Sequence, residues 1–259
     1  MGMRDELRDP GAEPRTIDKQ PARVAAIFDA IAPRYDLLNH LLSAGRDRHW
    51  RARAIASLEL TGRETVLDLC AGTADLALAA VRGHRRAARV LGIDFAREML
   101  ACGVRKVGAS PQPIWLVQGD ATRIPVATAS IDATTIAFGI RNVEAPERAF
   151  REIYRVLRAG GRLAILEFGI PRVAGIRPLY LWYFRTILPR IGRLVSRHRG
   201  AYDYLPASVG AFPPPEAMAA ELQTAGFSRV RFNSLTFGIV YLYVGVKPDA
   251  EHEMPSTGR

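Results

Sequence analysis

The segment from Thr65 to Asp75, TVLDLCAGTAD, constrains the fold more than any other part of the chain. A short run of β-branched and leucine residues reaches an acid, passes through small residues and continues with helical spacing. This order predicts a strand, a tight loop and a helix. Small residues let the backbone approach a ligand closely, and the first turn of a helix presents unpaired N–H groups. The segment therefore predicts a site for a nucleotide-like cofactor.

Acidic residues accompany the ends of three successive predicted strands: Asp68, Asp94 and Asp120. Open α/β sheets bind ligands at the carboxyl ends of their strands, and Asp94 lies twenty-two residues after Gly72, close to the usual ribose-binding spacing of about 20. A dinucleotide fold would need G-x-G-x-x-G, whereas this loop contains only Gly72, so NAD is disfavoured. One such acid alone more often caps a turn or helix. The three acids in this order, together with the loop, resemble the S-adenosylmethionine site of class I methyltransferases.

Strand-like and helical segments alternate through the body of the chain, which predicts an α/β fold with a Rossmann-like, mostly parallel sheet. Only Thr236-Phe237-Gly238 separates the last two strand-like runs, so they should form an antiparallel hairpin. Amphipathic segments between residues 24 and 58 predict an N-terminal helical lid. We expect one domain over residues 21–248, with a helical insert at about 172–205, between flexible tails 1–20 and 249–259. Further expected strands are 114–118, 133–138, 163–168, 229–235 and 239–246, and expected helices are 96–107, 146–158 and 216–225.

The charge balance predicts an anionic partner. The chain has 36 Lys and Arg against 26 Asp and Glu, for a net charge of +10, which would suit nucleic acid, an acidic membrane surface or a charged substrate. No uncharged apolar run approaches about 18 residues, so no membrane span is expected. Cys70 and Cys102 have neither metal-ligand nor disulfide spacing. A reducing, cytoplasmic setting without a bound metal follows as the expectation.

Several stretches together resemble the ubiquinone/menaquinone biosynthesis C-methyltransferases, over about residues 21 to 248. The order of Y-D-x-x-N and F-G-[IL]-R-N carries most of the specificity. The loop from Ala71 to Asp75 resembles the form found in menaquinone-pathway members, whereas a serine often found before F-G-[IL]-R-N is Ala137 here. The matching stretches are Val24–Asp29, Ala32–Asn39, Ala137–Val143, Tyr154–Leu157 through Gly160-Gly161, Leu166–Phe168, Leu188–Gly192 and Leu235–Gly238.

The resemblance implies S-adenosylmethionine-dependent C-methylation of the ring of a demethylated prenyl quinol. Demethylmenaquinol is the first expected acceptor, and the ubiquinone precursor is the alternative. The implied cofactor contacts are Thr73, Asp94, Asp120 and Ala121, and we place Asp68 of the preceding strand and Gly72 and Asp75 of the loop beside them. Asp94 would bind the ribose diol and Asp120 the adenine amine, while Asp75 would face the methionine ammonium or cap the helix.

Two residues are the expected catalytic groups. Arg141 should favour ionisation of the quinol hydroxyl beside the methylated carbon, because a guanidinium stays charged. Tyr35 should hydrogen-bond the same oxygen or a bridging water. The alternatives are that Arg141 pairs with a carboxylate such as Glu144 and that Tyr35 belongs to the core.

The segment 172–199 contains seven arginines and His198 but no Asp or Glu. As a helix, which Pro189 would kink, it would separate apolar residues from arginines. One hypothesis is peripheral contact with an anionic membrane that admits a polyprenyl tail; the other is a lid helix with solvated arginines. The apolar arc would be Tyr180, Phe184, Ile187, Leu188, Ile191, Leu194 and Val195, and the basic arc Arg185, Arg190, Arg193 and Arg197.

Two other functions compete with this interpretation. The positive charge would also suit an RNA methyltransferase, but no RNA-binding module or stacking platform is recognisable, so we expect no nucleic-acid partner. A non-catalytic subunit that binds cofactor or quinone is the second competitor, and the presence of both Tyr35 and Arg141 argues weakly against it. The sequence leaves the oligomeric state open, a homodimer included.

Overall fold

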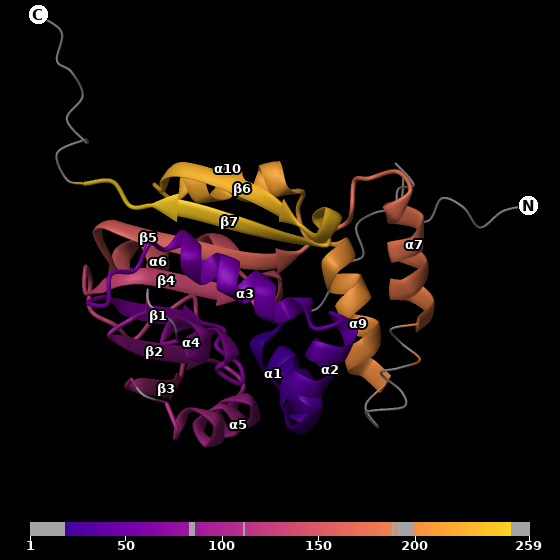
Figure 1. Ribbon diagram of the computed structural model, residues 1–259, viewed down its shortest axis with the longest axis horizontal. Coiled ribbons are helices and arrows are strands. Elements are labelled where there is room, and N and C mark those ends of the chain that lie inside the picture. The colour runs from indigo at the N-terminus through magenta and orange to yellow at the C-terminus, as the bar shows by residue number, and fades with distance from the viewer. Residues whose placement is uncertain (1–18, 83–85, 111, 188–189, 191–198, 250–259) are drawn as a thin grey trace, which may run out of the picture.

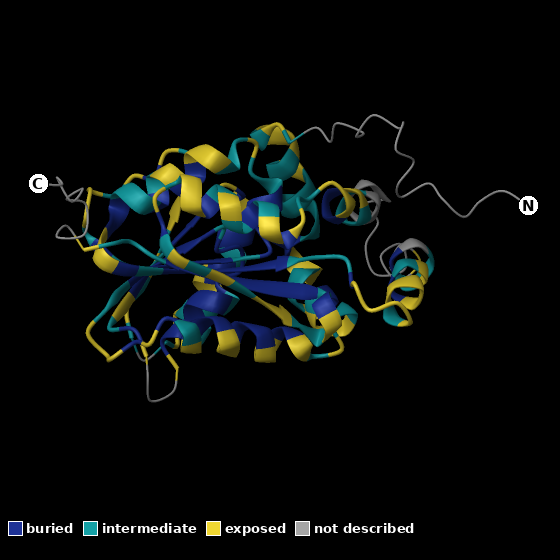
Figure 2. Ribbon diagram, turned by 90° about the horizontal axis from the view of Figure 1, so that it is seen from above, coloured by how far each residue is buried: buried dark blue, intermediate teal, exposed yellow. Residues whose placement is uncertain are grey.

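The computed structural model describes residues 19–82, 86–110, 112–187, 190 and 199–249. These residues form a three-layer α/β structure in which a buried sheet lies between two layers of helices (Figures 1 and 2). The α/β class expected from the sequence is confirmed. The expected tails, residues 1–20 and 249–259, fall almost wholly outside the described residues.

The described strands form one sheet in the order β3-β2-β1-β4-β5-β7-β6. Strands β1 to β5 run parallel to one another, whereas β7 is antiparallel to both β5 and β6. The expected C-terminal hairpin is therefore present, closed by the short helix η4 (Thr236–Gly238). The strands are β1 (Thr65–Leu69), β2 (Arg89–Asp94), β3 (Ile114–Gln118), β4 (Ile131–Ala137), β5 (Leu157–Phe168), β6 (Ser228–Leu235) and β7 (Val240–Val246).

Alternation along the central strands divides the core between the two faces of the sheet. Val66 of β1 packs into one hydrophobic cluster and its neighbour Leu67 into the other, and Ala164 and Ile165 of β5 divide in the same way. Successive side chains of a strand point to opposite faces, so a strand covered on both sides is apolar throughout. This explains why apolar residues in the central strands stand next to one another instead of alternating with exposed ones.

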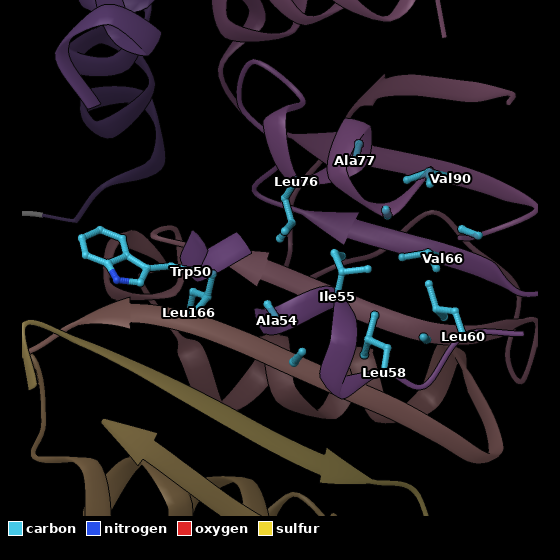
Figure 3. Packing of buried hydrophobic residues seen from close by; sticks show 14 of the residues in the cluster. Trp50, Ala54, Ile55, Leu58, Leu60, Val66, Leu76, Ala77, Val90 and Leu166 are labelled. Atoms are coloured by element: carbon cyan, nitrogen blue, oxygen red, sulfur yellow. The ribbon is translucent and has the colours of Figure 1, made fainter. Parts of the chain in front are cut away.

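Helices cover both faces. On one face lie α3 (Arg46–Ser57) and α4 (Asp75–Ala80), and α3 packs Trp50, Ala54 and Ile55 over the strands (Figure 3). On the other lie α6 (Pro146–Val156), with Phe150 and Ile153 fully buried, and α10 (Pro215–Thr224). Burying each large side chain contributes roughly 1.5–3 kcal/mol. Helix α5 (Arg97–Val107) packs beside β3 and β2.

One boundary expectation is wrong. The helical pattern predicted α6 through Arg158 and a strand only from Leu163, but α6 ends at Val156 and β5 begins at Leu157. Leu157 already pairs with Ile131 of β4, and Gly160 donates a backbone hydrogen bond to the Lys247 carbonyl. Pairing with neighbouring strands overrides the local helical preference here.

A helical roof covers the carboxyl ends of the strands. A third hydrophobic cluster holds the helices of this roof together. Its buried residues include Leu38 of α2, Tyr180 of α7 and Val209 of α9. Figure 1 shows α9 running between α2 and α7. The roof comprises α1 (Pro21–Ile31), η1 (Ala32–Arg34), α2 (Tyr35–Leu42), α7 (Ile176–Trp182), the π-helical turn η3 (Tyr183–Ile187) and α9 (Arg199–Gly210).

Within the expected insert at 172–205, residues 176–187 and 199–205 are helical, whereas residues 172–175 are not. Tyr180 and Phe184 of its predicted apolar arc are buried against the roof, as the lid hypothesis expects. Much of the rest lies outside the described residues: Leu188, Pro189, Ile191, Arg193, Leu194, Val195 and Arg197.

Candidate cofactor and acceptor site

The loop that follows β1, residues 70–75, makes an unusually tight turn. Cys70, Gly72 and Ala74 all adopt left-handed backbone conformations, with φ of 54°, 54° and 65°. Such a conformation is unfavourable for residues other than glycine and is found mainly where function demands it. The turn aims the Gly72 N–H at Asp94, whose Oδ2 accepts at 2.7 Å. We refer to residues 70–75 as the cofactor loop.

Asp94 ends β2 and faces this loop. Besides the Gly72 bond, its Oδ1 accepts the Ala96 N–H at 2.8 Å. Burial raises the pKa of Asp94, while these two backbone bonds act in the opposite direction. The carboxylate is held rigidly at the position from which the sequence predicts ribose binding.

The main cavity at the carboxyl end of the sheet has an empty volume of about 960 Å³, part of which is open to solvent. It contains Gly72, Asp94, Asp120, Ala121 and Tyr35 in its wall, so the structure brings together four of the seven expected cofactor residues and one expected catalytic residue. The N–H of Thr122 donates to Asp120 Oδ1 at 2.7 Å, which orients that carboxylate.

The other three expected cofactor residues, Asp68, Thr73 and Asp75, line a smaller adjoining cavity of about 330 Å³, which Gly72 and Tyr35 share. Asp68 is the most informative of them. Its Oδ1 accepts the Thr135 hydroxyl at 2.8 Å, but its buried Oδ2 has no hydrogen-bond partner among the described residues. Burial is the main cause that raises the pKa of Asp68 to about 7. An unpaired carboxylate oxygen beside a cavity fits the ammonium of a methionine moiety, so these residues suit S-adenosylmethionine.

Asp75 and Thr73 are tied into a charged network that the sequence analysis missed. Lys106 of α5 forms ion pairs with Asp75 and with Asp36 of α2, the latter at 2.7 Å, and Arg51 of α3 lies 3.3 Å from Asp75. The Thr73 hydroxyl donates to Asp36 at 2.5 Å. The cofactor loop is thereby joined to the roof. Asp36 belongs to the Y-D-x-x-N motif, which was the available signal, but nothing in the sequence pointed to Lys106.

Arg141 lies in η2 (Ile140–Asn142), and only 4% of it is exposed. Unlike Tyr35, it is not among the described residues that line the two cofactor cavities. Its partner is not Glu144, the carboxylate considered from the sequence, but Glu167 of β5, whose Oε1 accepts from Nη1 at 2.7 Å. The same nitrogen donates to the carbonyl of Phe138. A glutamate inside an apolar strand was the signal for this buried pair, because such a charge needs a partner.

Tyr35 begins α2 and lines, from the roof, the same cavity as the cofactor loop. It lines both cofactor cavities and meets Phe28 edge-on, with ring centroids 6.1 Å apart. Burial is the main cause that raises the pKa of the Tyr35 phenol. Its hydroxyl therefore stays protonated near neutral pH and is able to donate a hydrogen bond.

A third cavity of about 710 Å³ lies under the roof. Aromatic side chains dominate its wall, and Phe138 lines this cavity as well as the two cofactor cavities. Phe138 has a φ of 60° and stacks on Phe168 with centroids 4.4 Å apart. We name it the aromatic cavity; its apolar and aromatic lining residues are Leu42, Trp50, Phe138, Phe168, Tyr180, Tyr183, Phe184, Leu205 and Ile239.

A Rossmann-like sheet with this loop and these strand-end carboxylates defines a class I S-adenosylmethionine-dependent methyltransferase. Solved structures agree on the fold: a possible histamine N-methyltransferase from Thermotoga maritima, described as S-adenosylmethionine-dependent, matches with a TM-score of 0.59 at 18% identity, covering 86% of this chain and 99% of that one. The model of the ubiE/COQ5 methyltransferase family matches residues 16–247. The chain belongs to this family and uses S-adenosylmethionine.

Relatives of known description are similar over most of their length. A demethylmenaquinone methyltransferase of Thermus thermophilus is 46% identical over 222 residues, covering 86% of this chain and all of the relative. A ubiquinone/menaquinone biosynthesis C-methyltransferase of Syntrophotalea carbinolica is 45% identical over 221 residues, covering 85% of this chain and 92% of the relative. The family expected from the sequence motifs is confirmed.

Proposed function

We propose that this enzyme methylates a ring carbon of a demethylated prenyl quinol, with demethylmenaquinol as the preferred acceptor and the ubiquinone precursor as the alternative. The observation that carries the proposal is the position of Phe138, the shared wall between the cofactor cavities and the aromatic cavity. An acceptor ring placed beside Phe138 would present its reacting carbon to the cofactor cavities. Its apolar substituents would be buried in the aromatic cavity. The names of the relatives support the same acceptor class.

Cofactor binding is assigned to the residues around the loop. Asp94 would accept hydrogen bonds from the ribose hydroxyls, Asp120 would accept from the adenine amine beside Ala121, and Asp68 would face the ammonium. Gly72 and Thr73 leave room for the methionine end, while Asp75 acts through its ion pairs with Lys106 and Arg51. S-adenosylmethionine supplies a methyl group on a positively charged sulfur, which is the electrophile of the reaction.

The ring carbon becomes an adequate nucleophile when the neighbouring hydroxyl gives its proton to water. After methyl transfer that carbon loses its hydrogen and the oxygen is protonated again, so that one proton is released overall together with the demethylated cofactor. Tyr35, kept protonated by burial, donates a hydrogen bond to that oxygen and stabilises its charge. Arg141 lies 5.4 Å from the Phe168 ring centroid and favours the phenolate from behind the cavity wall, although Glu167 offsets part of its charge. It also holds the left-handed Phe138 backbone through its bond to the carbonyl.

The experiment that tests this function combines the enzyme, labelled S-adenosylmethionine and either reduced demethylmenaquinone or the ubiquinone precursor in detergent. Mass spectrometry of the extracted lipid should show one added methyl group on the ring, with more product from demethylmenaquinol. Absence of product from both acceptors, with cofactor binding intact, would refute the proposal.

We also propose that the roof rests on an anionic membrane surface. No helix in the described ranges is long and apolar enough to cross a membrane. Leu37 and Leu41 of α2, and Leu179 and Trp182 of α7, are more than half exposed, and the exposed Arg177 also lies on α7. Apolar side chains with neighbouring arginines are typical of interfacial binding.

Flotation with anionic and neutral vesicles, at low and high salt, tests this contact. The double substitution Leu179→Ser and Trp182→Ser should reduce recovery with anionic vesicles, whereas Val104→Ser, at an equally exposed position on α5, should not. Equal flotation of all three proteins would contradict the assignment. The homodimer that the sequence left open stays a hypothesis for sedimentation equilibrium.

A further inference from the structure

Tyr180 places a buried hydroxyl at the wall of the aromatic cavity. Its side chain comes from α7, only 6% of the residue is exposed, and its ring packs against Phe184 with centroids 4.6 Å apart. Within the described part of the chain the Tyr180 hydroxyl has no hydrogen-bond partner. Buried tyrosine hydroxyls normally have one, so this group calls for a functional explanation.

The other polar side chains that line the aromatic cavity are already engaged. Each has a hydrogen bond or ion pair that does not involve a ligand, which leaves Tyr180 as the unpaired polar group among the described lining residues. The pairs are Asn39 with Tyr35, Ser43 with Asp47 at 2.9 Å, Asp47 with Arg51, Trp50 with Thr236 at 2.9 Å, and Tyr183 with the Leu42 carbonyl at 3.3 Å.

The two tyrosines of the proposed acceptor space line cavities that share Phe138. Tyr35 lines the cofactor cavities, Tyr180 lines the aromatic cavity, and Phe138 lines all of them. A 1,4-quinol carries its two oxygens at opposite ends of one ring. When the oxygen beside the methylated carbon faces Tyr35, the second oxygen is directed into the aromatic cavity.

We propose that Tyr180 is an acceptor-binding residue whose hydroxyl donates a hydrogen bond to this second quinol oxygen. The inference rests on the proposed function and extends it, because it makes the enzyme selective for an acceptor with two oxygens rather than one. Burial raises the pKa of Tyr180, so the hydroxyl remains protonated and can donate. The prenyl chain then follows the apolar wall.

The test compares two acceptors that carry the same short prenyl chain: the reduced 1,4-naphthalenediol and the corresponding 3-prenyl-1-naphthol, which lacks the second oxygen. Tyr180→Phe should lower kcat/KM for the diol by about tenfold, the worth of one hydrogen bond to a buried partner, mainly through KM. It should leave kcat/KM for the naphthol unchanged. The two acceptors differ in ring reactivity, but this difference is the same for wild type and for Tyr180→Phe. It therefore cancels when the ratio of kcat/KM for diol and naphthol is compared between the two proteins.

Tyr183→Phe is the matched control, because it removes a hydroxyl from the same cavity that already has a backbone partner. It should affect both acceptors equally. Tyr180→Phe should also bind S-adenosylmethionine normally and melt at or above the wild-type temperature, since it removes an unpaired buried hydroxyl. A purely structural role would instead lower the melting temperature and slow both acceptors together.

The outcomes separate this inference from the proposed function. If wild-type enzyme methylates the diol and Tyr180→Phe keeps the same preference for diol over naphthol, the assignment of Tyr180 is wrong and the function stands. If the wild-type enzyme methylates neither compound, both are overturned. Loss of the preference in Tyr180→Phe alone supports the hydrogen bond.

Discussion

Asp68→Asn should change the pH dependence of both stability and cofactor binding. The Asp68 carboxyl is buried, and its pKa rises from 3.8 to about 7. Between these values the folded protein holds a proton that the unfolded chain has lost. The free energy of unfolding therefore falls as the pH rises from about 4 to 7 and is constant above that. Three pKa units correspond to about 4 kcal/mol.

Asparagine has nearly the shape of the protonated carboxyl and does not ionise. The cofactor-free Asp68→Asn variant should therefore exceed the free energy of unfolding of wild type by about 1.6 kcal/mol at pH 5, and this difference should grow to about 4 kcal/mol at pH 8. Urea denaturation at pH 5, 6, 7 and 8 measures the difference. A variant less stable than wild type at pH 8 would refute the reasoning, because it would mean that the ionised carboxylate is favoured in the fold.

Cofactor binding supplies the second half of this prediction. Only the ionised Asp68 attracts an ammonium, so the affinity of wild type for S-adenosylmethionine should rise about tenfold between pH 5.5 and 7. Asp68→Asn should bind more weakly, with a flat profile over the same interval. Isothermal titration calorimetry at each pH makes the measurement, and parallel profiles for the two proteins would exclude a role for Asp68 at the ammonium.

Three further changes test other parts of the site. Asp94→Ala should weaken S-adenosylmethionine binding by about a hundredfold, because charged hydrogen bonds contribute roughly 1.5–3 kcal/mol; a change below threefold by calorimetry would contradict ribose binding there. Gly139→Ala should lower the melting temperature by several degrees, because the new β-carbon would lie 2.2 Å from the β-carbon of Cys70 in the cofactor loop. Gly175→Ala is the control and should leave the melting temperature unchanged, because open space surrounds that position. Arg141→Ala should destabilise the protein by about 3–5 kcal/mol, because it leaves the buried Glu167 carboxylate without its ion-pair partner. Adding Glu167→Gln should restore much of the lost stability. If urea denaturation shows that the double variant loses the sum of the two single losses, the ion pair does not contribute as argued.

Much of the fold could be predicted from local patterns. The spacing of Phe150, Ile153 and Tyr154 predicted α6, and the three-residue connection at 236–238 required an antiparallel hairpin, because both signals depend on residues close in the sequence. The motifs around Tyr35 and Arg141 identified the family. The strand-end acids Asp94 and Asp120 were placed in one cavity because parallel strands bring their carboxyl ends to one edge.

The rest depends on contacts between residues far apart in the chain. Glu167 meets Arg141 only because β5 pairs beside β4, and Lys106 reaches Asp36 only because α5 packs against the roof. The unpaired Tyr180 hydroxyl is visible only once the partners of every neighbouring polar group are known. The sequence by itself determined the class of fold, the cofactor loop and the family, since periodicity and short motifs encode them locally. Only the tertiary structure decided which charges neutralise each other and where an acceptor can be held, because those properties arise from packing.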